Sequence, residues 1–169
     1  MSSPVSSLGP LLSSERHDWE TPDEILDLVR QLGLIDLDPC TSHENPCEAK
    51  AYLTHGGLDT DWRLHMTDGI GLVYCNPPYG REVADWVYKC IHESFRGSEI
   101  VLLTACRPDT EWYDRARRSC SAWCEIKGRL TFRGAKSPAP FPSVAHYWGP
   151  KPHLFAHVFS TIGRVGVRS

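Results

Sequence analysis

The sequence contains no long hydrophobic run. No apolar stretch in its 169 residues approaches the roughly 20 residues of a membrane-spanning helix, so no membrane span is expected. Residues 1–18 lack the basic start and the long apolar centre of a secretory signal, which predicts a cytoplasmic protein. Because this segment is rich in Ser, Pro and Gly, we expect a flexible arm over residues 1–18 and a single domain over residues 19–169.

The sequence also lacks a clear metal-binding pattern. Its seven cysteines are scattered, and the closest pair, Cys120 and Cys124, has no second pair at metal-ligand spacing. Without a secretory signal, we interpret the cysteines as reduced thiols and expect no metal. A zinc site that adds His146, His153 and His157 is the alternative to small core side chains and exposed imidazoles.

Net positive charge is absent, since the formal net charge is −3, and this argues against a simple nucleic-acid binder. The charges are nevertheless unevenly distributed. Residues 1–106 hold 7 basic and 17 acidic side chains, whereas residues 107–169 hold 11 basic and 4 acidic ones. This asymmetry predicts that the C-terminal part faces a polyanion. The alternative is a solvated basic surface with no partner.

Helical and strand patterns alternate along the chain. Thr21 as N-cap, Glu24 in a capping box and Gly33 as C-cap predict a helix over 21–33. Further helices are expected after Gly80, as far as Gly97, and over 108–118. Strands are expected at 34–40, 51–54, 71–75, 99–106, 121–128, 129–134, 143–149 and 153–160. The alternation predicts an α/β fold with a mostly parallel sheet and an antiparallel edge.

The strand over 71–75 ends in Asn76-Pro77-Pro78-Tyr79. We call these four residues the elbow. In an open α/β sheet, ligands bind at the carboxyl ends of the strands, where the elbow is expected. The prolines fix φ and remove two N–H groups, which leaves the Pro77 carbonyl beside the Asn76 side-chain oxygen. Two fixed acceptors suit an exocyclic amine, and Tyr79 offers a face for a planar heterocycle. A rigid turn, with Asn76 as a turn-former, is the alternative.

These residues carry a resemblance to a known family. The NPPY motif resembles the catalytic motif of amino-group methyltransferases that use S-adenosylmethionine. The chain as a whole resembles the phage-type, Dam-like DNA N-6-adenine-methyltransferase family, through WETP (19–22), LDPC (37–40), GLDTDW (57–62), NPPYG (76–80) and GRLTF (128–132). The resemblance implies a single Rossmann-like class I methyltransferase domain in a bacterial or phage-infected host cell.

The resemblance also implies a role for individual residues. Asn76 and the Pro77 carbonyl would accept hydrogen bonds from the adenine amine, Pro78 would stiffen the elbow, and Tyr79 would stack on the flipped base. The residues assigned to the S-adenosylmethionine site are Trp19, Thr21, Pro22, Asp38, Pro39 and Asp59, with Asp61 as a weaker candidate. Arg129, Phe132, Arg133 and Phe141 are candidates for DNA contact, although a solvated hairpin is the alternative for 129–134.

One feature departs from many methyltransferases. No glycine follows Asp38 until Gly56, so the resemblance does not define cofactor contacts in the intervening loop. The function expected from the sequence is methylation of adenine N6 in DNA, with DNA as partner. Methylation of RNA adenine or of protein glutamine, and an inactive nucleic-acid-binding relative, are the alternatives. The oligomeric state and the recognition sequence are not defined by these patterns.

Overall fold

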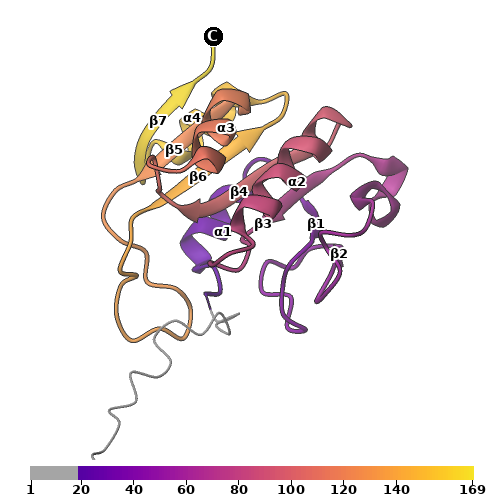
Figure 1. The fold of residues 1–169 in the computed structure, drawn as a ribbon, viewed down its shortest axis with the longest axis horizontal. Helices are drawn as coiled ribbons and strands as arrows, with labels where there is room; N and C mark the ends of the chain where they lie inside the picture. Colours follow the sequence, from indigo (N-terminus) through magenta and orange to yellow (C-terminus); the bar gives the residue numbers. More distant parts are fainter. Residues whose placement is uncertain (1–18) are drawn as a thin grey trace, which may run out of the picture.

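The computed structural model describes residues 19–169, so the predicted arm over 1–18 lies outside the described residues (Figure 1). The strands of the sheet are β1 (Ile35–Asp38), β2 (Ala51–Tyr52), β3 (Leu72–Cys75), β4 (Glu99–Ala105), β5 (Ala122–Ile126), β6 (Ser143–Trp148) and β7 (Gly163–Val167). The α-helices are α1 (Asp23–Arg30), α2 (Val83–Phe95), α3 (Glu111–Ser119) and α4 (Pro152–Phe159), and two 3-10 turns, η1 (Trp62–His65) and η2 (Thr67–Gly69), precede β3.

All seven strands form one mixed sheet in the order β2-β1-β3-β4-β6-β5-β7. The neighbours from β2 to β4 are parallel, whereas β6 is antiparallel to β4 and β5, and β7 is antiparallel to β5. The predicted Rossmann-like α/β fold is therefore confirmed. The antiparallel part reaches further into the sheet than an edge, because β6 is inserted between β4 and β5.

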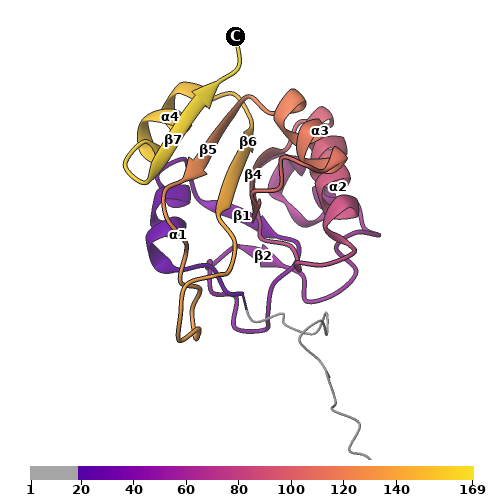
Figure 2. The same ribbon diagram turned by 60° about the vertical axis from the view of Figure 1, so that its left-hand side comes forward.

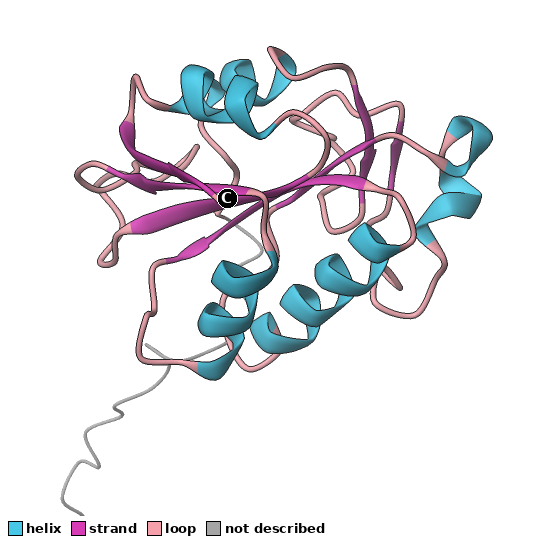
Figure 3. Cartoon of the chain, turned by 90° about the horizontal axis from the view of Figure 1, so that it is seen from above, coloured by secondary structure: helices cyan, strands magenta, loops and turns pink. Residues whose placement is uncertain are grey.

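Helices cover both faces of the sheet (Figures 2 and 3). α1 and α4 pack on one face through buried residues that include Val29 and Phe155, and α2 and α3 pack on the other through residues such as Val87 and Ala116. The central strands β3, β4 and β6 are almost fully buried, as the continuous apolar sequences of β3 and β4 predict, whereas the edge strands β2 and β7 contain no buried residue. Within residues 19–169, no helix has the length and apolar character that crossing a membrane requires.

Several predicted element boundaries are wrong. Helix α1 begins after Pro22 rather than Thr21, its C-cap is Gln31 rather than Gly33, and no side chain caps its N-terminus. Residues 129–134 form a loop, apart from one bridge between Glu20 and Arg133. The predicted strand over 153–160 is helix α4, in which Phe155, Val158 and Phe159 lie buried at helical spacing.

Strand β7 has no counterpart in the predicted elements. Its two glycines obscure the strand pattern, and a Cβ on Gly166 would lie only 2.0 Å from the ring of Trp123. Glycine is therefore required there by close packing against β5, which a strand propensity does not reveal.

Candidate active site

Asp38 ends β1, and Asn76 directly follows β3, its parallel neighbour in the sheet. Because carboxyl ends of parallel strands meet at the same edge, both residues line one cavity of about 630 Å³. The other predicted site residues that line it are Trp19, Thr21, Pro39, Pro77, Pro78 and Tyr79. Pro22, Asp59, Arg129, Phe132, Arg133 and Phe141 are not among its lining residues.

The carboxyl group of Asp38 is buried at the edge of this cavity, and the residue is only 5% exposed. It accepts hydrogen bonds from the backbone N–H of Cys40 at 3.1 Å and from the thiol of Cys47 at 3.2 Å. Burial nevertheless dominates and raises the pKa of Asp38 to about 6. Among the described residues, no cationic side chain forms an ion pair with this carboxylate.

The cavity as a whole is acidic. Glu20 and Glu82 line it together with Asp38, whereas no lysine or arginine of the described residues does so. An uncompensated buried carboxylate in such a cavity is stabilised by a cationic ligand, because the ligand replaces the hydration that burial removes.

The Asn76 side chain is held by both ends of its amide. Its Nδ2 donates to the Trp19 carbonyl at 2.7 Å and to the Thr21 hydroxyl at 3.1 Å, and its Oδ1 accepts from the Tyr79 hydroxyl at 3.2 Å. A backbone carbonyl can only accept, so the contact with Trp19 requires the nitrogen on that side. The two N–H bonds are thus engaged, and Oδ1 is the atom that can accept a further donor.

Thr21 is a buried partner of this amide rather than a helix cap. It is 4% exposed and shares a hydrogen bond of 2.6 Å with the hydroxyl of Tyr74, which is 1% exposed. Burial holds the pKa of Tyr74 well above its usual range, so the phenol stays protonated. The prediction of Thr21 as N-cap is wrong because these tertiary hydrogen bonds use its hydroxyl.

Four predicted site residues form one aromatic cluster. The ring of Tyr79 lies 5.0 Å from that of Phe141, 6.1 Å from that of Phe132 and 6.4 Å from that of Trp19, measured between centroids. Trp19 and Phe132 contact each other edge to face at 5.1 Å. Phe132 is 1% exposed and belongs to the core, so its direct contact with DNA would require the cluster to open.

The loop over residues 127–142 joins β5 to β6 and packs against the segment before α1. The backbone N–H of Arg133 donates to the Glu20 carbonyl at 2.9 Å, and its guanidinium pairs with Asp23. Arg129 is exposed, as are Lys127 and Lys136. The loop contains no acidic residue, so it presents positive charge beside the aromatic cluster.

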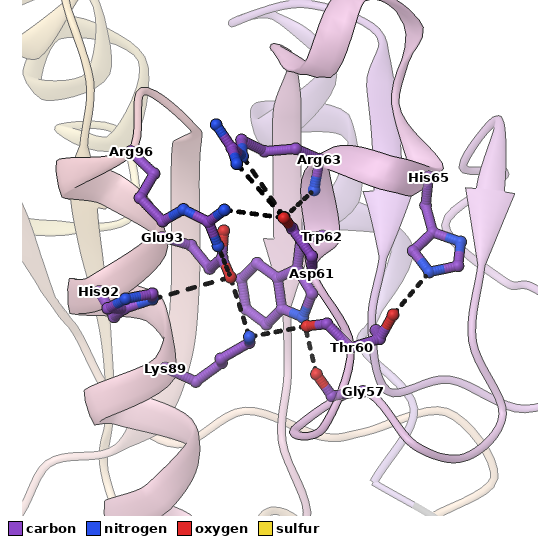
Figure 4. A network of polar contacts seen from close by, with 10 residues as sticks. All are labelled: Gly57, Thr60, Asp61, Trp62, Arg63, His65, Lys89, His92, Glu93 and Arg96. Atoms are coloured by element: carbon purple, nitrogen blue, oxygen red, sulfur yellow. Dashed lines mark hydrogen bonds and ion pairs between the residues drawn. The ribbon is translucent and has the colours of Figure 1, made fainter.

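The GLDTDW segment contacts α2 through a polar network (Figure 4). Asp61 accepts from Arg96 at 2.7 Å and from the backbone N–H of Arg63 at 3.0 Å. Lys89 bonds the Thr60 carbonyl at 2.7 Å and the buried carboxylate of Glu93 at 2.8 Å. These partners give Asp61 a structural role, while Asp59 is exposed and lies outside the cavity lining.

The same segment also forms part of the cavity wall. The buried Trp62 indole donates to the Gly57 carbonyl at 2.7 Å, and Gly57 packs closely against Pro39 and Trp86. Sequence reasoning did not single out Gly57 or Tyr74 as site residues. Their signals were a glycine directly before LDTDW and a tyrosine just before the elbow, in an otherwise apolar strand.

Metal-binding groups are not evident at this site. Across residues 19–169, no group of three or more His, Cys, Asp and Glu side chains is arranged to hold a metal ion. The thiols of Cys40 and Cys75 lie 3.7 Å apart beside the cavity, and neither forms a disulfide.

The Rossmann-like sheet presents the Asn-Pro-Pro-Tyr elbow and an acidic strand end to one cavity, the arrangement expected from the resemblance to amino-group methyltransferases. Comparison with family models defines the class more narrowly. Residues 9–144 match the model described as DNA N-6-adenine-methyltransferase (Dam), which covers more than half of the chain. The chain therefore belongs to this family of adenine-specific DNA methyltransferases. No curated protein matches the chain.

Proposed function

We propose that this protein transfers a methyl group from S-adenosylmethionine to the N6 amine of an adenine held out of the DNA helix. The observation that carries the proposal is the shared cavity, which is lined by both the Asn76–Tyr79 elbow and the buried Asp38 carboxylate. Membership of the DNA N-6-adenine-methyltransferase family supports the choice of adenine in DNA.

The residues of the cavity fit a cationic cofactor. S-adenosylmethionine supplies an electrophilic methyl group on a positively charged sulfur. Asp38 lacks a cationic partner among the described residues and would pair with a positive group of the cofactor, while Thr21 and Pro39 line the same space. The volume of about 630 Å³ lies within the range of small-molecule sites, roughly 300–1,000 Å³.

The elbow would act on the adenine amine by positioning. Asn76 Oδ1 and the Pro77 carbonyl accept its two N–H bonds, which draws the nitrogen lone pair out of conjugation with the ring and directs it at the methyl group. No covalent intermediate with the enzyme is needed, so orientation and electrostatics supply the catalysis. The Tyr79 ring would provide the surface on which the extruded base stacks.

Basic side chains of the 127–142 loop would hold the DNA backbone beside this site. Lys127, Arg129 and Lys136 are exposed and form no ion pair with another described residue. Contacts of lysine and arginine with phosphates give affinity without sequence information, which fits their position around the site rather than within it.

The proposal is tested with a radiolabelled methyl donor and unmethylated duplex DNA, with RNA and protein as parallel substrates. We expect label in DNA as N6-methyladenine, and we expect Asn76→Ala to lose nearly all transfer while it still binds the cofactor in calorimetry. Tyr79→Phe, which keeps the ring, is the matched variant and should retain measurable activity. Transfer to RNA or protein but not to DNA would contradict the substrate, and wild-type rates in Asn76→Ala would contradict the acceptor pair.

A further inference from the structure

The Asn76 amide can serve the proposed reaction in only one of its two orientations. An asparagine side chain carries one acceptor and one double donor, and a rotation of the amide by half a turn exchanges them. If the nitrogen faced the adenine amine, two donors would meet and the amine could not be bound. The enzyme therefore needs contacts that distinguish the oxygen of this amide from its nitrogen.

The segment before α1 provides such contacts. The Trp19 carbonyl lies 2.7 Å from Asn76 Nδ2 and cannot donate, so it excludes the rotated amide. The Thr21 hydroxyl, 3.1 Å from the same nitrogen, accepts the second N–H. With both N–H bonds engaged, Oδ1 is left as the group that faces new donors. It carries two lone pairs, so the bond from Tyr79 does not exhaust it.

A hydroxyl alone would not fix the amide, because it can donate as well as accept. The Thr21 hydroxyl is held by Tyr74 at 2.6 Å, inside the protein where neither side chain contacts bulk water appreciably. The chain Tyr74–Thr21–Asn76 links strand β3 to the residues before α1 across more than 50 positions of sequence. Hydrogen bonds in such a buried chain polarise one another.

We propose that Thr21 and Tyr74, together with the Trp19 carbonyl, are positioning residues that lock the Asn76 amide with its oxygen available to the target amine. This inference rests on the proposed function and adds to it a role for Thr21 other than cofactor contact. It explains why a threonine precedes Pro22 although no side chain caps helix α1.

The loop over 127–142 would help to keep the Asn76 amide in this orientation. The Glu20–Arg133 bridge pins the backbone between Trp19 and Thr21, the two residues whose oxygens receive the amide. The ring of Trp19 is packed against Phe132 and Phe141 of the same loop. The basic loop beside the site is thus joined to the Asn76 amide through Trp19, Glu20 and Thr21.

Thr21→Val tests the lock because valine keeps the shape of threonine and removes the hydroxyl. We expect the single-turnover rate of methyl transfer to fall about 10- to 100-fold, while the calorimetric Kd for the cofactor changes less than about 2-fold. Thr21→Ser restores the hydroxyl and should recover the rate to within about 3-fold of wild type. Tyr74→Phe, which leaves the Thr21–Asn76 bond in place, should show a smaller loss in the same direction.

Thr104→Val is the matched control. Thr104 is fully buried on β4, and its hydroxyl has no hydrogen-bond partner among the described residues, so this variant removes a buried hydroxyl outside the lock. It should transfer methyl groups at the wild-type rate. Circular dichroism and the thermal midpoint establish that each variant is folded.

The outcomes separate the lock from the proposed function. If the wild-type protein transfers no methyl group to DNA, the proposed function fails. If wild type is active and Asn76→Ala is not, but Thr21→Val keeps wild-type rates, the lock is refuted. A loss of cofactor affinity in Thr21→Val that accounts for the whole loss of rate, without recovery in Thr21→Ser, also overturns it and assigns Thr21 to cofactor binding.

Discussion

Gly57→Ala should disrupt the proposed cofactor site, because Gly57 lies in the wall of the cavity. A Cβ at this position would lie 2.0 Å from the Pro39 carbonyl oxygen and 2.7 Å from the Trp86 ring. Ordinary carbon contacts need more than about 3 Å, so the segment must move by about 1 Å relative to Pro39. Overpacking of this kind costs about 1–3 kcal/mol, and the displaced neighbour directly follows Asp38. We expect a thermal midpoint lower by about 2–4 °C per kcal/mol for a domain of this size.

Gly166→Ala provides the matched control for this prediction. Its Cβ would lie equally close, 2.0 Å, to the ring of Trp123, but on β7, away from the cavity. Both variants should lose stability in thermal unfolding followed by circular dichroism, whereas only Gly57→Ala should bind the cofactor at least about 10-fold more weakly in calorimetry. Equal affinities in the two variants, or wild-type stability in Gly57→Ala, would refute the reasoning.

Three further predictions concern charge. Asp38 has a pKa raised to about 6, so the ligand-free folded state binds a proton that the unfolded state has released. Stability should therefore fall by up to about 3 kcal/mol as pH rises from about 3 to about 7, and urea unfolding of Asp38→Asn should not show this fall. Asp61 pairs with Arg96 and so joins the GLDTDW segment, part of the cavity wall, to α2. Asp61→Asn and Arg96→Met should therefore each raise the KM for the methyl donor more than they lower kcat. Because both changes break the same ion pair, the loss in initial rate of the double variant should be smaller than the sum of the two single losses. Replacing Arg129 and Lys136 by Gln should reduce the slope of log Kd for DNA against log salt by about 1 for each phosphate that is no longer neutralised. An unchanged slope in filter binding would show that neither side chain contacts a phosphate.

The elbow and the acidic strand end were predictable because their signals are local. A short apolar strand that ends in Asn76-Pro77-Pro78-Tyr79 defines its own geometry, since the prolines fix φ whatever the rest of the chain does. The parallel arrangement of β1 and β3 then brings Asp38 to the same edge. This part of the cavity also depends on the strand order β2-β1-β3, which the alternation of strands and helices does not define.

The role of Thr21 could not be predicted in the same way. Thr21 and Glu24 match a capping box within four residues, whereas the partner that occupies the hydroxyl, Tyr74, is 53 positions away. A local pattern cannot report a competing tertiary hydrogen bond. Helix α4 was mistaken for a strand for a related reason, because Phe155, Val158 and Phe159 also have high strand propensity and the core selects the helical spacing.

The charge of the C-terminal part is distributed over two edges of the sheet. β5 runs parallel to β4, because β6 is antiparallel to both, so its start lies at the edge opposite the cavity. Arg117 and Arg118 closely precede β5, and Arg168 follows β7 at the same edge, where the Arg117 guanidinium lies 3.3 Å from the Trp123 ring centroid. The sum of charges over 107–169 thus overstates the basic character at the site. We expect DNA to contact the loop over 127–142, because this loop follows β5 at the cavity edge and contains four basic residues and no acidic one.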